Sequence, residues 1–312
     1  MNKFIQYIKD FHKDYFDIYL YIKVILFVTI LLVFNYTLDF EDKFIDKYYG
    51  NYIRIPLFFL YHGIAFYGVY FIIWLHDKKR VSFSKGFWIK SAIGLLILSV
   101  DRSIFPQFIK LVMPNTNPAT YRFMFKVLFN VYGIFTILMT IAIMKFIFDK
   151  KENYGIYGLR FTKVDYKAYF LMLLIMVPIV FAATLFPDFL DYYPTYKRTG
   201  GAAFARFHKI PEYISVLIYE TIYLFDFVNT ELFFRGFLVI GLSKLMGKNV
   251  ILPMAAAYVV LHFGKPLGES ISSFFGGYIL GIIALYSKNI WGGVFVHGGI
   301  AFLMELFAFL RQ

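Results

Sequence analysis

The stretch Tyr21–Tyr36 reads YIKVILFVTILLVFNY, and Lys23 is its only charged residue. A helix that crosses a bilayer needs about 20 mostly apolar residues. With its neighbouring residues this stretch approaches that length, so it predicts a transmembrane helix.

Comparable apolar segments recur to the end of the chain, with short polar breaks between them. They are Ile53–Leu75, Phe87–Leu98, Phe123–Phe148, Tyr169–Phe186, Tyr213–Leu245, Val250–Phe263, Ser270–Tyr286 and Ile290–Leu310. The composition agrees, because 60% of the 312 residues are hydrophobic and only 17% are charged, whereas soluble domains carry about 25% charged residues. The sequence predicts an all-α fold, a polytopic membrane helix bundle of eight or nine transmembrane helices.

The formal net charge of +12 comes from lysines and arginines in short loops beside the apolar segments. Such clusters mark the cytoplasmic ends of membrane spans, and they form no extended basic face of the kind that binds nucleic acid. They precede the first segment and follow the second and the fourth, so we expect these loops and the amino terminus on one side of the membrane. The expected partner is the lipid bilayer and not nucleic acid. The expected location is a cell membrane, the bacterial inner membrane, which the chain crosses several times.

The polar segment Lys150–Lys167 divides the chain into two halves of different character. The apolar segments of the first half contain few ionisable residues, whereas those of the second half contain several. We therefore expect N-terminal transmembrane helices over residues 1–165 and a membrane-embedded catalytic core over residues 166–312. The chain has no cysteine, which excludes disulfides, thiolate metal ligands and cysteine nucleophiles.

The stretch Asn229–Phe237, NTELFFRGF, places a carboxylate and a guanidinium inside an apolar segment. A charged side chain at the centre of a membrane helix costs about 2.5–3.5 kcal/mol. At about 100° per residue, Glu231 and Arg235 share one stripe of a helix and can pair, whereas Asp226 and Thr230 share a second stripe. One interpretation is that the pair is a structural salt bridge that lowers the cost of burial.

Two histidines follow on later segments. His262 lies in AAAYVVLHFGKP, and His297 lies in IWGGVFVHGGIAF with glycines on both flanks. A single intramembrane histidine often only bonds two helices, but two histidines and the carboxylate of Glu231 are the groups that an intramembrane hydrolase gathers around one water. Glu269 follows a Gly-Lys-Pro break that ends the preceding helix. Its carboxylate either folds back toward His262 or, the alternative we favour, lies among lipid headgroups.

The order of these residues resembles the motifs of the CAAX protease and bacteriocin-processing family, the intramembrane proteases that include the type II prenyl-protein endopeptidases. The family motifs are Glu-Glu-x-x-x-Arg, Phe-x-x-x-His and His-x-x-x-Asn or Asp. The matching stretches are Thr230–Arg235, Tyr258–His262 and His297–Ala301, within about residues 213–302. The resemblance implies an intramembrane glutamate endopeptidase that cleaves a hydrophobic or lipidated peptide or protein.

In this family the first glutamate is thought to activate the attacking water, one histidine assists it, and the other histidine and the asparagine hold the developing oxyanion. Here Thr230 and Ala301 replace the first glutamate and the asparagine. A threonine hydroxyl is a poor general base near neutral pH, so another carboxylate has to act: Glu231 is favoured, Asp226 comes second and Glu269 third. The predicted catalytic residues are Glu231, His262 and His297, and the predicted supporting residues are Arg235, Asp226, Thr230, Glu269 and Tyr258.

Three other functions fit parts of the pattern. Thr230 and Ala301 favour a catalytically degenerate relative that binds a peptide or partner protein, in immunity or scaffolding. His262, His297 and a glutamate are a ligand set that can bind catalytic zinc, although the preferred mechanism uses no cofactor and no metal. Ionisable residues inside spans also mark the ion pathways of transporters, but no inverted repeat supports that function.

Overall fold

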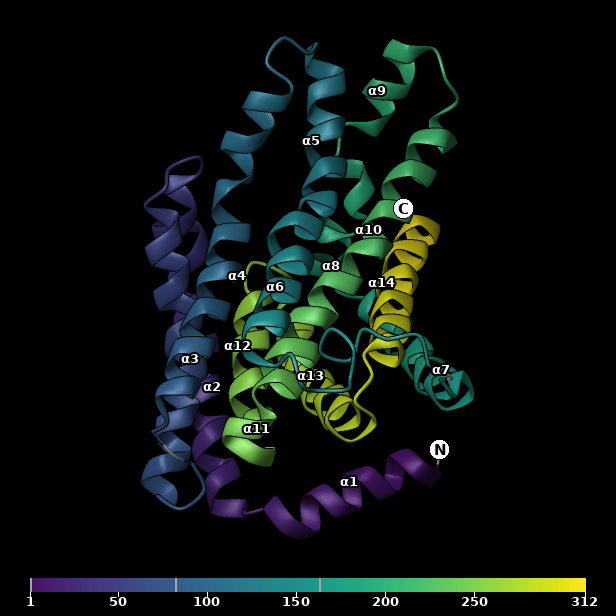
Figure 1. Cartoon of the computed structure of the whole chain (residues 1–312). Coiled ribbons are helices and arrows are strands. Elements are labelled where there is room, and N and C mark those ends of the chain that lie inside the picture. Colours follow the sequence, from purple (N-terminus) through teal and green to yellow (C-terminus); the bar gives the residue numbers. More distant parts are fainter. Residues whose placement is uncertain (1, 82, 163) are drawn as a thin grey trace.

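The computed structural model describes residues 2–81, 83–162 and 164–312. Over these residues the chain is helical, and the only extended pairing is an isolated antiparallel bridge between Ile156 and Leu159. Among the described residues, eight helical segments are long and apolar enough to cross a membrane. The predicted all-α membrane bundle is therefore confirmed (Figure 1).

The helices follow one another with short connections. The first half of the chain contains α1 Asn2–Tyr15, α2 Ile18–Leu38, η1 Glu41–Ile45, η2 Asp46–Tyr48, α3 Arg54–His76, α4 Lys85–Val112, α5 Pro118–Gly133, η3 Ile134–Leu138 and α6 Met139–Phe148. The second half contains α7 Tyr166–Ala183, α8 Pro187–Tyr192, η4 Thr195–Arg198, α9 Gly201–His208, α10 Glu212–Glu231, η5 Leu232–Gly241, α11 Ser243–Met246, η6 Gly247–Val250, α12 Ile251–Leu261, α13 Leu267–Ser287 and α14 Trp291–Arg311. Each predicted apolar segment corresponds to a helix or to consecutive helices.

Several helices begin at side chains that bond free backbone N–H groups. The Asp17 carboxylate accepts hydrogen bonds from the backbone N–H groups of Tyr19 and Leu20 at the start of α2. Ser84 and Asn117 act in the same way for α4 and α5. These first-turn N–H groups have no partner within the helix, so the caps fix where the spans start.

Helix α4 extends fourteen residues beyond the predicted end at Leu98, to Val112. Sequence hydropathy falls there because Asp101, Arg102 and Pro106 interrupt the apolar run. The helix continues because Thr136 of η3 donates a hydrogen bond to the Asp101 carboxylate, so the charged turn has a polar neighbour inside the bundle. The proline removes one backbone donor without ending the helix.

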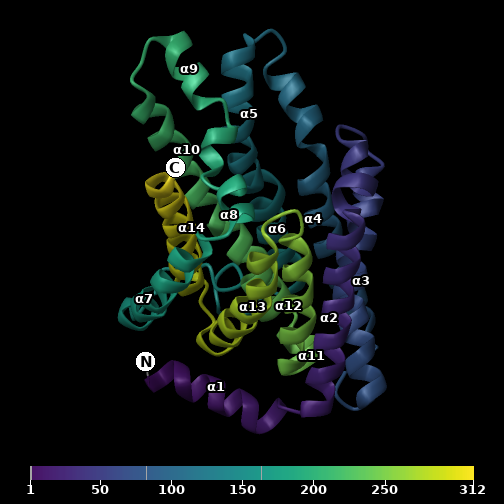
Figure 2. The ribbon, with the colours of Figure 1, turned by 180° about the vertical axis from the view of Figure 1, so that it is seen from behind.

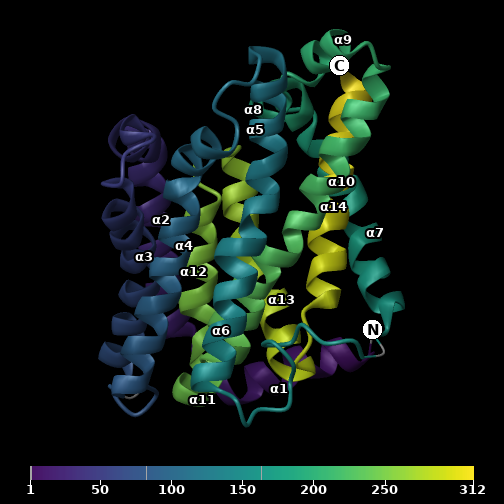
Figure 3. The same ribbon diagram turned by 45° about the horizontal axis from the view of Figure 1, so that its top comes forward.

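Helix α1 lies crosswise at one end of the bundle of long helices (Figures 1 and 2). Ion pairs join this end together: Arg80 lies 3.4 Å from Asp17, and Lys248 lies 2.6 Å from Asp14. Lys244 of α11 also pairs with Glu152 in the loop after α6. The amino terminus and the loops after α3 and α6 therefore share one end, as the charge pattern predicted. Helix α9 and the carboxyl terminus lie at the opposite end (Figure 3).

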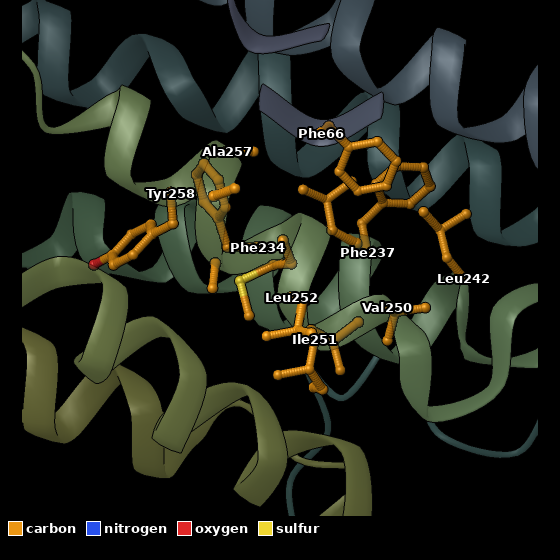
Figure 4. Packing of buried hydrophobic residues seen from close by; sticks show 14 of the residues in the cluster. Phe66, Phe234, Phe237, Leu242, Val250, Ile251, Leu252, Ala257 and Tyr258 are labelled. Atoms are coloured by element: carbon orange, nitrogen blue, oxygen red, sulfur yellow. The ribbon is translucent and has the colours of Figure 1, made fainter. Parts of the chain in front are cut away.

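Helix α12 lies at the centre of the largest hydrophobic cluster, where Phe66 of α3 and Phe234 and Phe237 of η5 pack with it (Figure 4). Three consecutive alanines, Ala255–Ala257, are fully buried and let α3 and α13 approach α12 closely. The cluster takes residues from both sides of position 165, and the division of the chain at that position stays a prediction. This packing fixes the end of α12, where Tyr258 and His262 lie.

Candidate active site

Glu231 is the last residue of α10, and the backbone then widens into the π-helical segment η5 that carries Arg235. Segments with i→i+5 hydrogen bonds are rare and often occur at functional sites. Glu231 Oε1 lies 3.0 Å from Arg235 Nη1, and the two side chains are 0% and 1% exposed. The predicted pairing of these two residues is therefore confirmed.

His297 of α14 lies against the same carboxylate. Its Nδ1 is 2.9 Å from Glu231 Oε1, and because a carboxylate only accepts, the ring donates through Nδ1–H. The neutral imidazole then presents Nε2 as its acceptor. Gly293, one turn earlier on α14, makes this contact possible, since a Cβ atom there would lie 2.2 Å from Glu231 Oε2.

Tyr258 of α12 contacts both His297 and Arg235, the two residues that lie against the Glu231 carboxylate. Its hydroxyl lies 3.0 Å from His297 Nε2 and 3.2 Å from His297 Nδ1, and the Arg235 guanidinium lies over its ring at 4.0 Å from the centroid. Figure 4 shows the hydroxyl pointing away from the aliphatic cluster. Tyr258 thus connects the buried ion pair to the second helix of the site.

His262 follows at the end of α12. Its Nδ1 lies 2.8 Å from the Tyr258 carbonyl oxygen, so Nδ1–H donates and Nε2 keeps its lone pair. The ring centroid of His262 lies 6.4 Å from that of His297.

Glu269 folds back toward His262 rather than lying among headgroups, the alternative the sequence favoured. Gly264 adopts a positive φ of 77°, and α13 begins at Leu267, so the chain reverses within a few residues. Glu269 Oε1 lies 2.8 Å from Lys265 Nζ and 3.9 Å from His262 Nε2. The carboxylate is near the histidine because Lys265 neutralises it there.

A cavity of about 1230 Å³ opens beside these residues. Apolar side chains of α7, α13 and α14 form most of its wall, and α1 contributes Phe4, Ile5 and Ile8 at one end. His262, His297 and Tyr258 face it, whereas the fully buried Glu231 does not line it. Glu231 therefore lies behind His297 as seen from the cavity, and its predicted role as the direct base stays a prediction.

Asp226 and Thr230 lie elsewhere. They line a separate cavity of about 80 Å³ together with Asp101 and Arg102 of α4, and Asp226 Oδ1 accepts a hydrogen bond of 2.8 Å from Asn229 Nδ2. This placement follows from the second helical stripe that the sequence indicated. The structure brings Glu231, Arg235, Tyr258, His262, Glu269 and His297 together, and it separates Asp226 and Thr230 from them.

Sequence reasoning missed three members of this site. Lys265 stands in the stretch quoted for His262, and its charge beside an intramembrane histidine was an available signal. Gly293 was identified only as one of the glycines that flank His297. Tyr193, whose hydroxyl donates to Glu269 Oε2 at 2.8 Å, comes from a distant connection, and no sequence signal indicated it.

Among the residues that the structure describes, no group of three His, Cys, Asp or Glu side chains is arranged so that it could hold a metal ion. The Nδ1 atoms of His262 and His297 already bond a carbonyl oxygen and a carboxylate. The candidate site is thus made of a buried carboxylate, a guanidinium, two imidazoles and a phenol.

Fold and site together define a multi-pass membrane protein with a buried carboxylate–histidine pair beside an apolar cavity. Residues 212–303 match the family model described as type II CAAX prenyl endopeptidase Rce1-like. This match to a family of CAAX-type intramembrane proteases runs from the start of α10 into α14 and confirms the resemblance carried by the three motifs. Neither a curated protein nor a solved structure matches the chain.

Proposed function

We propose that the protein is an intramembrane endopeptidase of a cell membrane, the bacterial inner membrane, and that it hydrolyses a peptide bond of a hydrophobic or lipid-modified peptide. The observation that carries the proposal is the Glu231–His297 contact of 2.9 Å at the edge of the large cavity. A buried carboxylate that accepts from Nδ1–H makes the opposite ring nitrogen a better proton acceptor, as in other carboxylate–histidine pairs.

In this mechanism Glu231 activates water through His297. The attacking water is bound between the imidazoles of His297 and His262, whose ring centroids lie 6.4 Å apart, and it hydrogen-bonds to the Nε2 atom of each ring. His297 takes the proton as the water oxygen bonds to the carbonyl carbon. The C–N bond then breaks, His297 returns the proton to the leaving nitrogen, and the products are a carboxylic acid and an amine.

The cavity supports a substrate with a long apolar portion. Its wall is apolar along α7 and α13, and wall residues such as Ile175 of α7 and Phe275 of α13 are exposed at the surface of the bundle. Exposed apolar residues on a membrane span face lipid tails, so a hydrocarbon chain can pass from the bilayer into this space. The proposed chemistry needs no resident metal, and strong chelators should leave cleavage unchanged.

The test is reconstitution in liposomes with a panel of quenched fluorescent peptides, some carrying a farnesylated cysteine. Cleavage by the wild type that is lost in Glu231→Gln, His262→Ala and His297→Ala supports the proposal. Asp226→Asn is the matched control, because Asp226 lies in the other cavity. Cleavage lost in Asp226→Asn but kept in Glu231→Gln contradicts the assignment of Glu231.

The second candidate function is a catalytically degenerate protein that binds a peptide or partner in the same cavity. Thr230 and Ala301, which replace two motif residues of the family, favour it. Retained binding of a farnesylated peptide without any turnover, in the wild type and in His297→Ala alike, is the result that selects this function. Turnover that depends on His297 removes it.

A further inference from the structure

We propose that the hydroxyl of Tyr258 supplies the oxyanion hydrogen bond that Ala301 cannot donate. This inference rests on the proposed function, since it assigns a donor for the same reaction. Two motif positions depart from the family pattern together: a tyrosine replaces the phenylalanine of the second motif, and an alanine replaces the asparagine of the third. One change adds a donor and the other removes one.

The geometry allows the exchange. Ala301 follows His297 by one turn of α14, and Ala301, His297 and Tyr258 line the same cavity. The Tyr258 hydroxyl lies 3.0 Å from His297 Nε2, so the donor stands next to the nitrogen that takes the proton from water. An oxyanion formed by attack of that water develops within reach of the hydroxyl.

The hydroxyl is also held in place. Arg235 lies over the ring at 4.0 Å, Phe234 packs against it with ring centroids 5.0 Å apart, and the residue is 3% exposed. Donors that are fixed before the reaction stabilise developing charge most effectively, because no reorganisation is needed when the charge appears. When the attacking water binds to His297 Nε2, only the hydroxyl hydrogen has to rotate, from that nitrogen toward the substrate oxygen. That rotation also frees Nε2 to accept the proton.

The experiment compares Tyr258→Phe, Ala301→Asn and the double variant Tyr258→Phe/Ala301→Asn, which restores the family residues. Loss of one oxyanion donor lowers turnover by about 10²- to 10³-fold. We expect Tyr258→Phe to lose kcat in that range with KM unchanged, and the double variant to regain most of it. Tyr67→Phe is the control, because it removes a tyrosine–serine hydrogen bond of 2.9 Å on α3, away from the cavity.

The rescue in the double variant distinguishes two roles of Tyr258: a hydrogen-bond donor to the oxyanion, and a residue that only orients His297. An asparagine at position 301 restores a donor but does not replace a contact to the imidazole ring. The shape of the pH profile of kcat should stay the same in Tyr258→Phe, whereas a changed orientation of His297 shifts it. Tyr258→Phe with wild-type kcat, or a loss that Ala301→Asn does not repair, overturns the proposal.

A binding measurement tests the inference independently of turnover. A phosphinate peptide carries a tetrahedral, negatively charged centre, and a matched amide peptide does not. Tyr258→Phe should weaken the binding of the phosphinate peptide by at least 10-fold and leave the binding of the amide peptide unchanged, because only transition-state contacts are lost. Equal weakening of both peptides, or of neither, overturns the role of Tyr258. Failure of the proposed function appears differently, as wild-type cleavage that is absent or indifferent to Glu231→Gln.

Discussion

Glu231 and His297 are joined across two helices by a contact of 2.9 Å between Oε1 and Nδ1, although 66 residues separate them in the chain. Arg235 reaches the same oxygen at 3.0 Å. One carboxylate oxygen therefore serves both a structural ion pair and an imidazole that faces the cavity. The carboxylate is held by Arg235, and its access to the cavity runs through the ring of His297.

The first prediction separates these two roles of Glu231. Glu231→Gln should abolish cleavage and also destabilise the protein by about 3–5 kcal/mol, because it leaves the buried Arg235 without its partner. The double variant Glu231→Gln/Arg235→Met removes both charges and should regain most of the stability but no activity. Thermal unfolding in detergent and the liposome cleavage assay measure the two effects. Recovery of cleavage in the double variant contradicts a chemical role for the carboxylate.

The second prediction concerns the glycine that gives His297 its contact. A Cβ atom at Gly293 would lie 2.2 Å from Glu231 Oε2, so Gly293→Ala should displace the carboxylate and lower both activity and melting temperature. Gly298→Ala, on the same helix, meets its nearest atoms at 3.9 and 4.0 Å. This control substitution should leave the protein equally stable or slightly more stable, since alanine stabilises a helix by about 0.5–1 kcal/mol relative to glycine. Equal effects of the two substitutions contradict this account.

The sequence was informative where the signal is local. Segments of apolar residues predicted the spans, and the i, i+4 spacing predicted the Glu231–Arg235 pair that the structure contains. The same helical arithmetic placed Asp226 and Thr230 on a different stripe, and they line a different cavity. Each of these inferences depends only on residues within one helix.

The periodicity of the sequence does not predict contacts between helices. The sequence did not indicate which of the two imidazoles bonds Glu231, because that depends on how α14 packs against α10. Glu269 was expected among headgroups, and it lies 3.9 Å from His262 because the reversal at Gly264 is tight. Helix α4 was predicted too short, since Thr136, the partner of Asp101, lies on another helix.

The third prediction is a loss of stability as pH rises, and it comes from Glu41 at the end opposite to α1. Burial raises the pKa of this carboxyl from 4.5 to about 8, against a smaller opposing effect of Arg102. Its backbone N–H bonds Asn35 Oδ1 at 3.1 Å, which fixes the residue in its buried position. Between about pH 4.5 and 8 the folded state holds a proton that the unfolded chain has lost, so stability declines through this range and levels off above it. Glu41→Gln, which is neutral throughout, should remove the decline and raise the melting temperature at pH 8 and above. The exposed Asp39→Asn serves as the control, and a melting temperature of Glu41→Gln that follows the wild type from pH 5 to 9 contradicts the prediction.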